Sequence, residues 1–229
     1  METLEQIKTR VENAIGGARL KIIANGSPSG QVSLLVDAVH ALEVAKFLRD
    51  DPLLRLDYAS NVTGIDWLDS VTKEVVKTKQ VIEGVEREIT ETIETKKPGH
   101  LEAVYHLYSM KLKHGPVILR LRTANRTDQN HLPSLTPVWR GTEFQEREIY
   151  DLYGIIFDGH PDLRRILMWD GYPYFPLRKD FPLEGLPSEM PDVALTKATP
   201  MEGGPFVTIP SRAGSKDREP RAHPPQLEE

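Results

Sequence analysis

The distribution of proline is the feature that most restricts what this sequence can fold into. Of its 18 prolines, ten precede Glu184 and eight follow it. Residues 184–229 also contain four glycines and few large apolar residues, so this segment cannot offset its ordering entropy with a core of its own. We therefore expect a folded domain over residues 1–183 and an extended tail over 184–229. The tail is either a disordered terminus or a strap that orders on a partner, and the apolar residues 206–209 favour docking.

Composition excludes several kinds of chemistry. These 229 residues contain no cysteine, which rules out thiolate-ligated clusters, disulfides and a cysteine nucleophile on them. The net charge of −5 lacks the basic excess typical of nucleic-acid binding. Residues 1–17 include acids and no apolar segment, and no stretch approaches the ~20 apolar residues of a membrane span. We expect a soluble cytoplasmic protein that has no cofactor of its own and binds no nucleic acid.

Hydrophobic periodicity predicts alternating helices and strands before the tail. In residues 116–123, Val117, Leu119 and Leu121 alternate with more polar positions, as in a strand with one buried face. The pattern indicates an α+β fold, a mainly antiparallel sheet with helices packed on one side. The expected helices are 4–15 and 38–49, and the expected strands are 19–24, 31–36, 53–62, 65–68, 101–110 and 116–123.

Residues 69–99 differ in composition from their surroundings. They contain six basic and seven acidic side chains, with threonine and valine prominent. Apolar residues recur near helical spacing, whereas the β-branched content favours strands. The segment is therefore interpreted as an inserted, surface-lying hairpin or helix.

A further helix is predicted over residues 143–153. Thr142 and Gln145 have the spacing of a capping box, and Gly154 is suited to end the helix. The residues expected to face the core are Phe144, Ile149 and Leu152.

The charged residues of this helix are candidates for a catalytic or cation-binding site. Glu143, Arg147 and Asp151 lie four apart and form one stripe of alternating charge, in which each neighbouring pair would stabilise the helix slightly if exposed. Glu146 and Glu148 are about 200° apart around the helix, which argues against a shared acid–base or cation site. Glu148 and Asp151 could converge, but Arg147 beside them can neutralise the pair. A structural role is favoured over a catalytic one.

Residues 160–168 follow a turn. Pro161 suits the first position of a helix, so a second short helix is predicted through residues 163–168. His160 has no second ligand at metal-binding spacing and is interpreted as a hydrogen-bonding residue near a helix start, or as a partner contact. Adjacent Arg164 and Arg165 diverge by about 100° on a helix, which leaves at least one of them available for a partner.

Residues 172–183 are not expected to form regular structure because three prolines remove backbone donors. Aromatic and arginine side chains are enriched in interfaces, which favours coverage by another polypeptide. The alternative is that the segment packs back on its own domain. Its apolar and aromatic residues are Tyr172, Tyr174, Phe175, Leu177 and Phe181.

The stretch 139–183 resembles the complex I 30 kDa family, the C subunits of NADH-quinone oxidoreductase, and weaker similarity extends over residues 1–183. Two regions depart from the family pattern, the insert at about 69–99 and residues 168–175. The residues that carry the resemblance are Glu146, Arg147, Glu148, Asp151, Gly154, Phe157, His160, Pro161, Arg164 and Arg165, followed by Pro176, Leu177, Arg178, Lys179, Asp180 and Phe181.

The resemblance implies a non-catalytic subunit of the peripheral arm of a multi-subunit, proton-translocating enzyme. It implies no catalytic, cofactor-binding or metal-binding residue on this chain, with FMN and iron–sulfur clusters on partner subunits. It further implies docking on the 49 kDa-type subunit, which has the quinone cavity, and on its cluster-bearing neighbours. The expected location is the cytoplasmic face of a bacterial inner membrane, with membrane contact only through the complex.

Two alternatives accompany this interpretation. The chain could be the equivalent subunit of a related membrane-bound hydrogenase or ferredoxin-dependent dehydrogenase. It could also be a free-standing enzyme that uses Asp151, His160 and Asp162 as acid–base groups, which would require these side chains to converge in a pocket.

Overall fold

The computed structural model describes residues 2–25, 30–82, 85–169, 171–183 and 185–186, with the backbone alone for 72–82 and 85–94. The tail predicted over 184–229 lies almost wholly outside these residues, so the tail and the domain boundary before it stay predictions.

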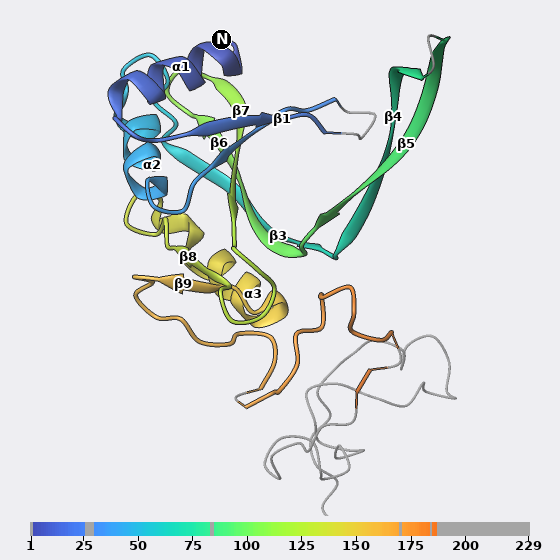
Figure 1. Cartoon of the computed structure of the whole chain (residues 1–229). Coiled ribbons are helices and arrows are strands. Elements are labelled where there is room, and N and C mark those ends of the chain that lie inside the picture. Colours follow the sequence, from blue (N-terminus) through green and yellow to red (C-terminus); the bar gives the residue numbers. More distant parts are fainter. Residues whose placement is uncertain (1, 26–29, 83–84, 170, 184, 187–229) are drawn as a thin grey trace, which may run out of the picture. The chain divides into compact units, whose positions relative to one another are not determined.

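A five-stranded sheet forms the centre of the described part (Figure 1). Its strand order is β1-β2-β7-β6-β3, and every neighbouring pair is antiparallel except β2 and β7, which are parallel. The α+β class with a mainly antiparallel sheet is therefore confirmed. The strands are β1 (Leu20–Ile23), β2 (Ser33–Val36), β3 (Tyr58–Trp67), β6 (His100–Ser109) and β7 (His114–Arg122).

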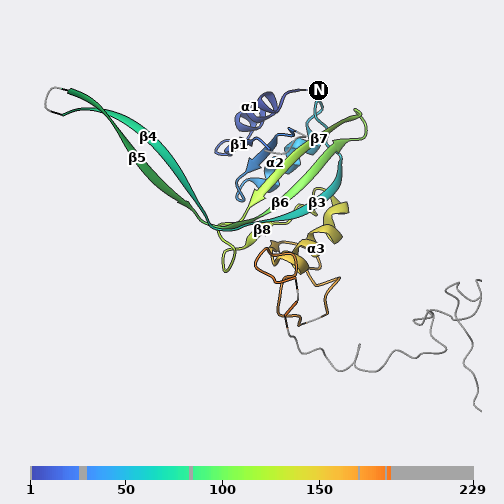
Figure 2. The ribbon, with the colours of Figure 1, turned by 90° about the vertical axis from the view of Figure 1, so that its right-hand side faces the viewer.

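The helices pack on one face of this sheet. In Figure 2, strands β7 and β6 lie in front of α2, so the viewer sees the helix-free face. Alternate residues of β6 point to the helix side and are fully buried, among them Leu101 and Tyr105. They share one hydrophobic core with Ile7 and Val44 of the first two helices and with Ile149 of the third. The helices are α1 (Leu4–Ala14), α2 (Ala41–Asp50) and α3 (Glu143–Tyr153).

Local hydrogen bonds determine where the first two helices begin. Thr3 and Gln6 form a reciprocal capping box at the start of α1. Helix α2 begins three residues later than predicted because Asp37 accepts hydrogen bonds from the backbone and ring of His40, at 2.8 Å each, which holds residues 37–40 in a turn.

The 69–99 segment is a β-hairpin. Strands β4 (Ser70–Ile82) and β5 (Val85–Lys97) pair antiparallel from Ser70 opposite Lys97 to Ile82 opposite Val85. Figure 1 shows the hairpin leaving the end of the sheet beside β3. The helical alternative is therefore wrong, and the β-branched content was the better signal.

A pair of short strands and a 3-10 helix were not predicted. Strands β8 (His131–Pro133) and β9 (Ile156–Asp158) form a short parallel pair, in which Leu132 and Phe157 are buried. A 3-10 helix, η1 (Arg140–Thr142), leads directly into α3. Both elements fix the two ends of α3, around which the candidate site is built.

Candidate interface site

Helix α3 has the predicted bounds but a different N-terminal cap. Gly154 ends it in the left-handed conformation, at φ +76°, as expected. The predicted capping box is wrong, because the Thr142 hydroxyl donates to Trp139 O at 2.9 Å and caps no helical N–H. Gln145 instead accepts a hydrogen bond from Val62 N in strand β3. The polar side chain that was expected to cap the helix therefore fastens it to the edge of the sheet.

The charge stripe on α3 is mostly buried, so its pairs are not exposed surface pairs. Arg147 and Asp151 are buried, whereas Phe144, which was expected to face the core, is 64% exposed. Ile149 and Leu152 are buried as predicted. Hydrophobic spacing misassigned Phe144 alone among these three residues, because buried carboxylates share the inner side of the helix with Ile149 and Leu152.

Glu146 is the first of these carboxylates and lies at the centre of a polar cluster. It is fully buried, while Glu148 is exposed on the opposite side of the helix. Burial raises the pKa of Glu146, although the Ser134 hydroxyl, at 2.6 Å, and Leu135 N, at 2.9 Å, favour its charged form. The Tyr105 hydroxyl donates from strand β6 at 3.1 Å. Glu146 thus ties α3, the sheet and the loop 134–136 together.

Most of the partners of Glu146 are hydroxyl groups, which leads to a test. Hydroxyls can rotate to accept as well as donate, so Glu146→Gln should change the free energy of unfolding by less than about 1 kcal/mol. Glu146→Ala leaves several buried groups unpartnered and should cost about 2–4 kcal/mol. Denaturant unfolding of both variants checks this, and equal losses would contradict it.

The pH dependence of stability should also change in Glu146→Gln. A carboxyl whose folded pKa is raised stabilises the fold most below its unfolded pKa, and that contribution disappears as pH rises through the folded pKa. The Gln variant should therefore lose less stability than the parent protein as pH rises above the ordinary range of a glutamate. Parallel stability curves would refute this role.

Asp151 is the second buried carboxylate and organises the chain after α3. It accepts hydrogen bonds from the backbone N–H groups of Ile166, Leu167 and Met168, at 3.0, 2.7 and 2.9 Å. Arg165 completes the set with an ion pair at 2.7 Å. Burial opposes its charge, but these donors outweigh burial and hold the pKa of Asp151 below its usual range.

The short helix predicted over residues 163–168 is wrong, and Asp151 explains why. The N–H groups that would donate to preceding carbonyls in a helix donate to its carboxylate instead. A single side chain from α3 thereby replaces the internal hydrogen bonds of that turn.

Arg165 joins this loop to the aromatic segment that follows. Its guanidinium donates to Asp151 O at 2.9 Å and to Tyr172 O at 2.7 Å. It also lies over the rings of Tyr172 and Phe175, at 5.8 and 5.2 Å from their centroids. Arg164 pairs with a different acid, Asp162, at 2.9 Å, and its side chain is 69% exposed. The divergence expected for a helix does not apply, because no helix forms here.

Residues 172–183 form no helix or strand in the part described, as predicted. Backbone and side-chain groups of this segment bond to its own domain, which was the alternative considered from the sequence. Leu177 N donates to Leu152 O at 3.1 Å, and Arg178 Nε donates to Tyr153 O at 2.7 Å. Lys179 N donates to the buried Asp66 at 2.8 Å.

Asp66 and Arg126 anchor the far end of the segment. Arg126 forms a two-pronged ion pair with Asp66, at 2.7 Å for each bond, and reaches Asp180 at 3.0 Å. Burial opposes the charge of Asp66, but the Arg126 guanidinium and Lys179 N hold its pKa below the usual range. Neither Asp66 nor Arg126 was predicted from the sequence, where the only signal was a lone aspartate in an apolar strand.

The remaining site residues have ordinary positions. Phe157 is buried in β9, Pro161 is exposed, and Pro176 and Phe181 are partly buried. The ring of His160 lies 3.0 Å from Glu143 O at the start of α3, in agreement with the hydrogen-bonding interpretation.

Four side chains on α3 and the segments after it are at least half exposed, and we call them the outer patch. Phe144, Leu167 and Leu177 are 64, 57 and 50% exposed. Arg164 is the fourth, and its backbone carbonyl accepts from Arg147 Nε at 3.2 Å. Arg147 also lies over the Phe144 ring at 5.4 Å. The outer patch is therefore held by the buried network beneath it.

The acid–base constellation considered from the sequence is not assembled. The Asp151 carboxylate is buried and occupied, and Asp162 contacts Arg147 and Arg164 instead. Among the residues described, no group of three His, Asp or Glu side chains could hold a metal ion. No helix in this part of the chain is long and apolar enough to cross a membrane.

The fold and site define an α+β module in which buried carboxylates shape a surface loop. Residues 34–187 match the family described as "Respiratory-chain NADH dehydrogenase, 30 Kd subunit", and the chain belongs to this family. The resemblance noted in the sequence is thereby confirmed. Members of this family are subunits of a multi-subunit enzyme of the respiratory chain.

Individual relatives agree with this assignment. The chain is 38% identical over 163 residues to the NADH-quinone oxidoreductase C subunit of Saccharopolyspora erythraea, covering 70% of this chain and 53% of the relative. It is 35% identical over 178 residues to the C 2 subunit of the same enzyme in Rhizobium meliloti, covering 77% and 79%. The chain thus spans about half the length of the first relative.

A solved structure supports the fold alone. A chain of the membrane-bound sulfane sulfur reductase, described as an archaeal respiratory membrane complex, superposes with a TM-score of 0.52 at 19% identity. The match covers 80% of this chain and 87% of that one.

Proposed function

We propose that this chain is a non-catalytic subunit of the peripheral arm of a proton-translocating NADH-quinone oxidoreductase. In this proposal it supports assembly and docks on the subunit with the quinone cavity, at the cytoplasmic face of the membrane. FMN and iron–sulfur clusters reside on partner subunits. The absence of cysteine on these residues agrees with such a division of roles.

The outer patch is the observation that carries the docking proposal. Exposed aromatic, aliphatic and arginine side chains resemble the anchors of protein interfaces. Asp151 accepts from Leu167 N, and Arg147 contacts the Phe144 ring and the carbonyl of Arg164. The remaining residue, Leu177, donates its N–H to Leu152 O, so none of the four lies on a free loop. A preformed patch lowers the entropy cost of binding.

Phe144→Ala and Arg164→Ala should lower the amount of assembled complex while leaving the melting temperature of the isolated chain nearly unchanged. Both side chains are largely exposed, so truncation removes partner contacts rather than core packing. Interface anchors cost more than about 1 kcal/mol when truncated. Native gels and NADH-quinone activity of membranes measure assembly, and thermal unfolding measures the chain.

Lys46→Ala is the matched control because Lys46 is exposed on α2, away from the outer patch. Normal assembly with both patch variants would sink the docking proposal. Arg178 is a poor probe, since it donates to Tyr153 O and lies over the Phe175 ring.

A related membrane-bound hydrogenase or ferredoxin-dependent dehydrogenase is the second candidate. The two candidates differ in the partners they require. Under the proposed function, purification of a tagged chain should recover flavin- and cluster-bearing subunits that oxidise NADH. Recovery of hydrogenase subunits, or of a module reduced by ferredoxin alone, would favour the second candidate.

A further inference from the structure

A groove at one end of the sheet is separate from the outer patch. It lies where the parallel strands β2 and β7 end, and it encloses about 600 Å³. The carboxyl ends of adjacent parallel strands are a common place for binding crevices in open sheets, and this volume lies within the range of about 300–1,000 Å³ found for ligand sites.

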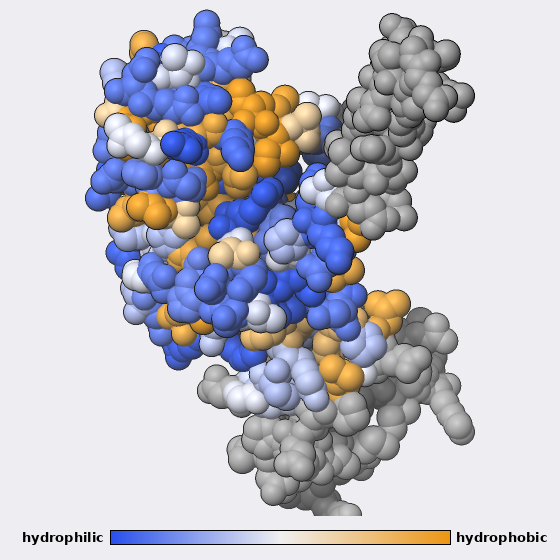
Figure 3. All heavy atoms as spheres, in the orientation of Figure 1, coloured by the Kyte–Doolittle hydropathy of each residue, from blue (hydrophilic) through white to orange (hydrophobic). Residues whose placement is uncertain are grey.

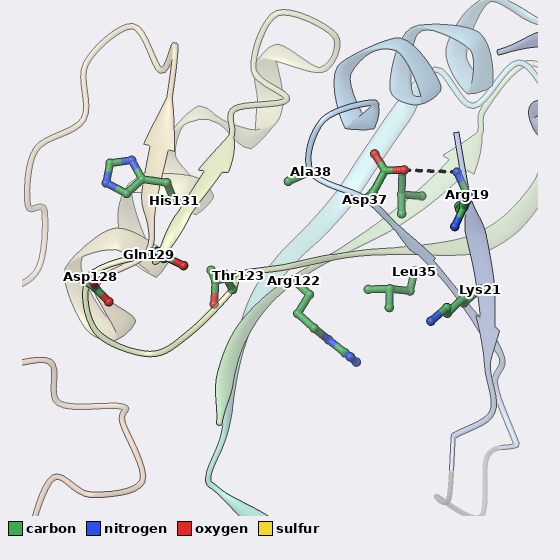
Figure 4. A pocket seen from close by; sticks show the side chains of 12 residues that line it. Arg19, Lys21, Leu35, Asp37, Ala38, Arg122, Thr123, Asp128, Gln129 and His131 are labelled. Carbon is green, nitrogen blue, oxygen red and sulfur yellow. Dashed lines mark hydrogen bonds between the residues drawn. The ribbon is translucent and has the colours of Figure 1, made fainter. Parts of the chain in front are cut away.

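The floor of the groove is apolar and its rim is cationic. Leu35, Val36 and Ala38 contribute from the end of β2. Figure 4 shows Lys21 and Arg122 on either side of Leu35. In Figure 3, hydrophobic surface gathers over the region of β1 and β7, with hydrophilic surface around it. The groove thus offers an apolar contact beside positive charge.

The two carboxylates that line the groove keep their negative charge, but their oxygens already accept hydrogen bonds from neighbouring groups. Asp37 accepts from Arg19 N at 3.2 Å and from the backbone and ring of His40. Asp128 accepts from Asn125 Nδ2 at 2.6 Å and from the Thr127 hydroxyl at 3.1 Å. Neither carboxylate is paired with a rim cation.

The cationic groups of Arg19 and Lys21, in contrast, form no ion pair within the described residues. Both side chains are exposed. Arg122 pairs with Glu102 at 2.8 Å and is 40% exposed. In the described part of the chain, Arg19 and Lys21 are therefore two unpaired cations beside an apolar floor, and an occupant with a carboxylate would complement them.

We propose that this groove binds a segment of a neighbouring subunit that presents a carboxylate beside an apolar side chain. The apolar side chain packs on Leu35 and Ala38, and the carboxylate pairs with Lys21 and Arg19. The inference rests on the proposed function, because it requires the chain to work within an assembly. It adds a second contact surface to the chain, at the ends of β2 and β7, in addition to the outer patch around α3.

The test uses the assembled complex, purified with a photoreactive amino acid in place of Lys21. Irradiation and peptide mapping should identify one cross-linked segment of another subunit, containing aspartate or glutamate beside an apolar residue. The same substitution at Lys46, on the exposed side of α2, serves as the matched control. A cross-link to an acid-free segment, to a second copy of this chain, or to no polypeptide would overturn the proposal.

Charge reversal provides an independent readout. Arg19→Glu with Lys21→Glu should reduce retention of the chain in the complex during a salt wash at least fivefold, whereas Lys46→Glu should not. Replacing the cross-linked acid by lysine should restore retention. Failure of this rescue, or equal losses with the control, would overturn the groove proposal.

The two proposals fail in different ways. If the chain co-purifies with NADH-oxidising subunits and Phe144→Ala lowers assembly, but position 21 gives no cross-link, only the groove proposal is wrong. If the chain co-purifies with none of these subunits, the proposed function is wrong.

Discussion

Replacing Asp151 by alanine should reduce the free energy of unfolding by about 3–5 kcal/mol, the range seen when one partner of a buried ion pair is removed. The substitution leaves Arg165 unpaired and removes the acceptor of three backbone N–H groups. Denaturant unfolding monitored by circular dichroism measures the loss.

Two comparisons separate this role from a general effect of losing a helix carboxylate. Glu148→Ala, on the exposed side of α3, should change stability by less than about 0.5 kcal/mol. Asp151→Asn keeps one acceptor oxygen but loses the charge, so its loss of stability should lie between those of Asp151→Ala and Glu148→Ala.

The stabilisation by Asp151 should also depend on pH. Because the pKa of Asp151 is lowered in the fold, its contribution to stability is present above the unfolded pKa and lost as pH falls through the folded pKa. A parent protein that keeps full stability through that acidic range would contradict this.

Gly154→Ala should be the second severe substitution, at a cost of about 2–4 kcal/mol. Gly154 has φ +76°, and a Cβ there would lie 2.6 Å from the Phe175 ring and 2.8 Å from Arg178 Nη2. The substitution combines backbone strain with a collision that displaces the segment after residue 172. Limited proteolysis should detect faster cleavage in that segment.

Gly141→Ala is the matched control for this prediction. A Cβ at Gly141 meets nothing within 4 Å, and its φ is not in the left-handed range. We expect a change of less than about 1 kcal/mol for this variant. Similar losses in both variants would show that neither end of α3 tolerates an added methyl group, rather than that Gly154 is needed specifically to accommodate Phe175.

The sequence predicted the regular elements well where hydrophobic spacing and glycine agreed. The bounds of α3 and most strands of the central sheet followed from period and turn residues. The exception is β3, which is one strand over Tyr58–Trp67 where two stretches, 53–62 and 65–68, were predicted. The parallel pairing of β2 with β7 could not be read in this way, because these strands lie far apart in sequence. Strand order depends on contacts that no local pattern encodes.

The site was less predictable because its polar residues act over long distances. Glu146 and Asp151 resemble surface charges in the sequence, and only their partners show that they are buried. Tyr105, 41 residues from Glu146, and Lys179, 113 residues from Asp66, carry no local sign of these hydrogen bonds. The irregular conformation of residues 172–183 was predictable, since proline restricts the backbone directly.

The parallel pairing has a consequence for the order in which the chain folds during synthesis. Strand β2 pairs with residues 118–121 of β7, so the middle of the sheet cannot close until those residues have emerged from the ribosome. The β4–β5 hairpin lies between the two strands and contains only local pairs, which form early. The apolar faces of α1, α2 and the β1–β2 hairpin therefore stay exposed until β7 has been synthesised. Binding by a chaperone during this time would protect the growing chain from aggregation.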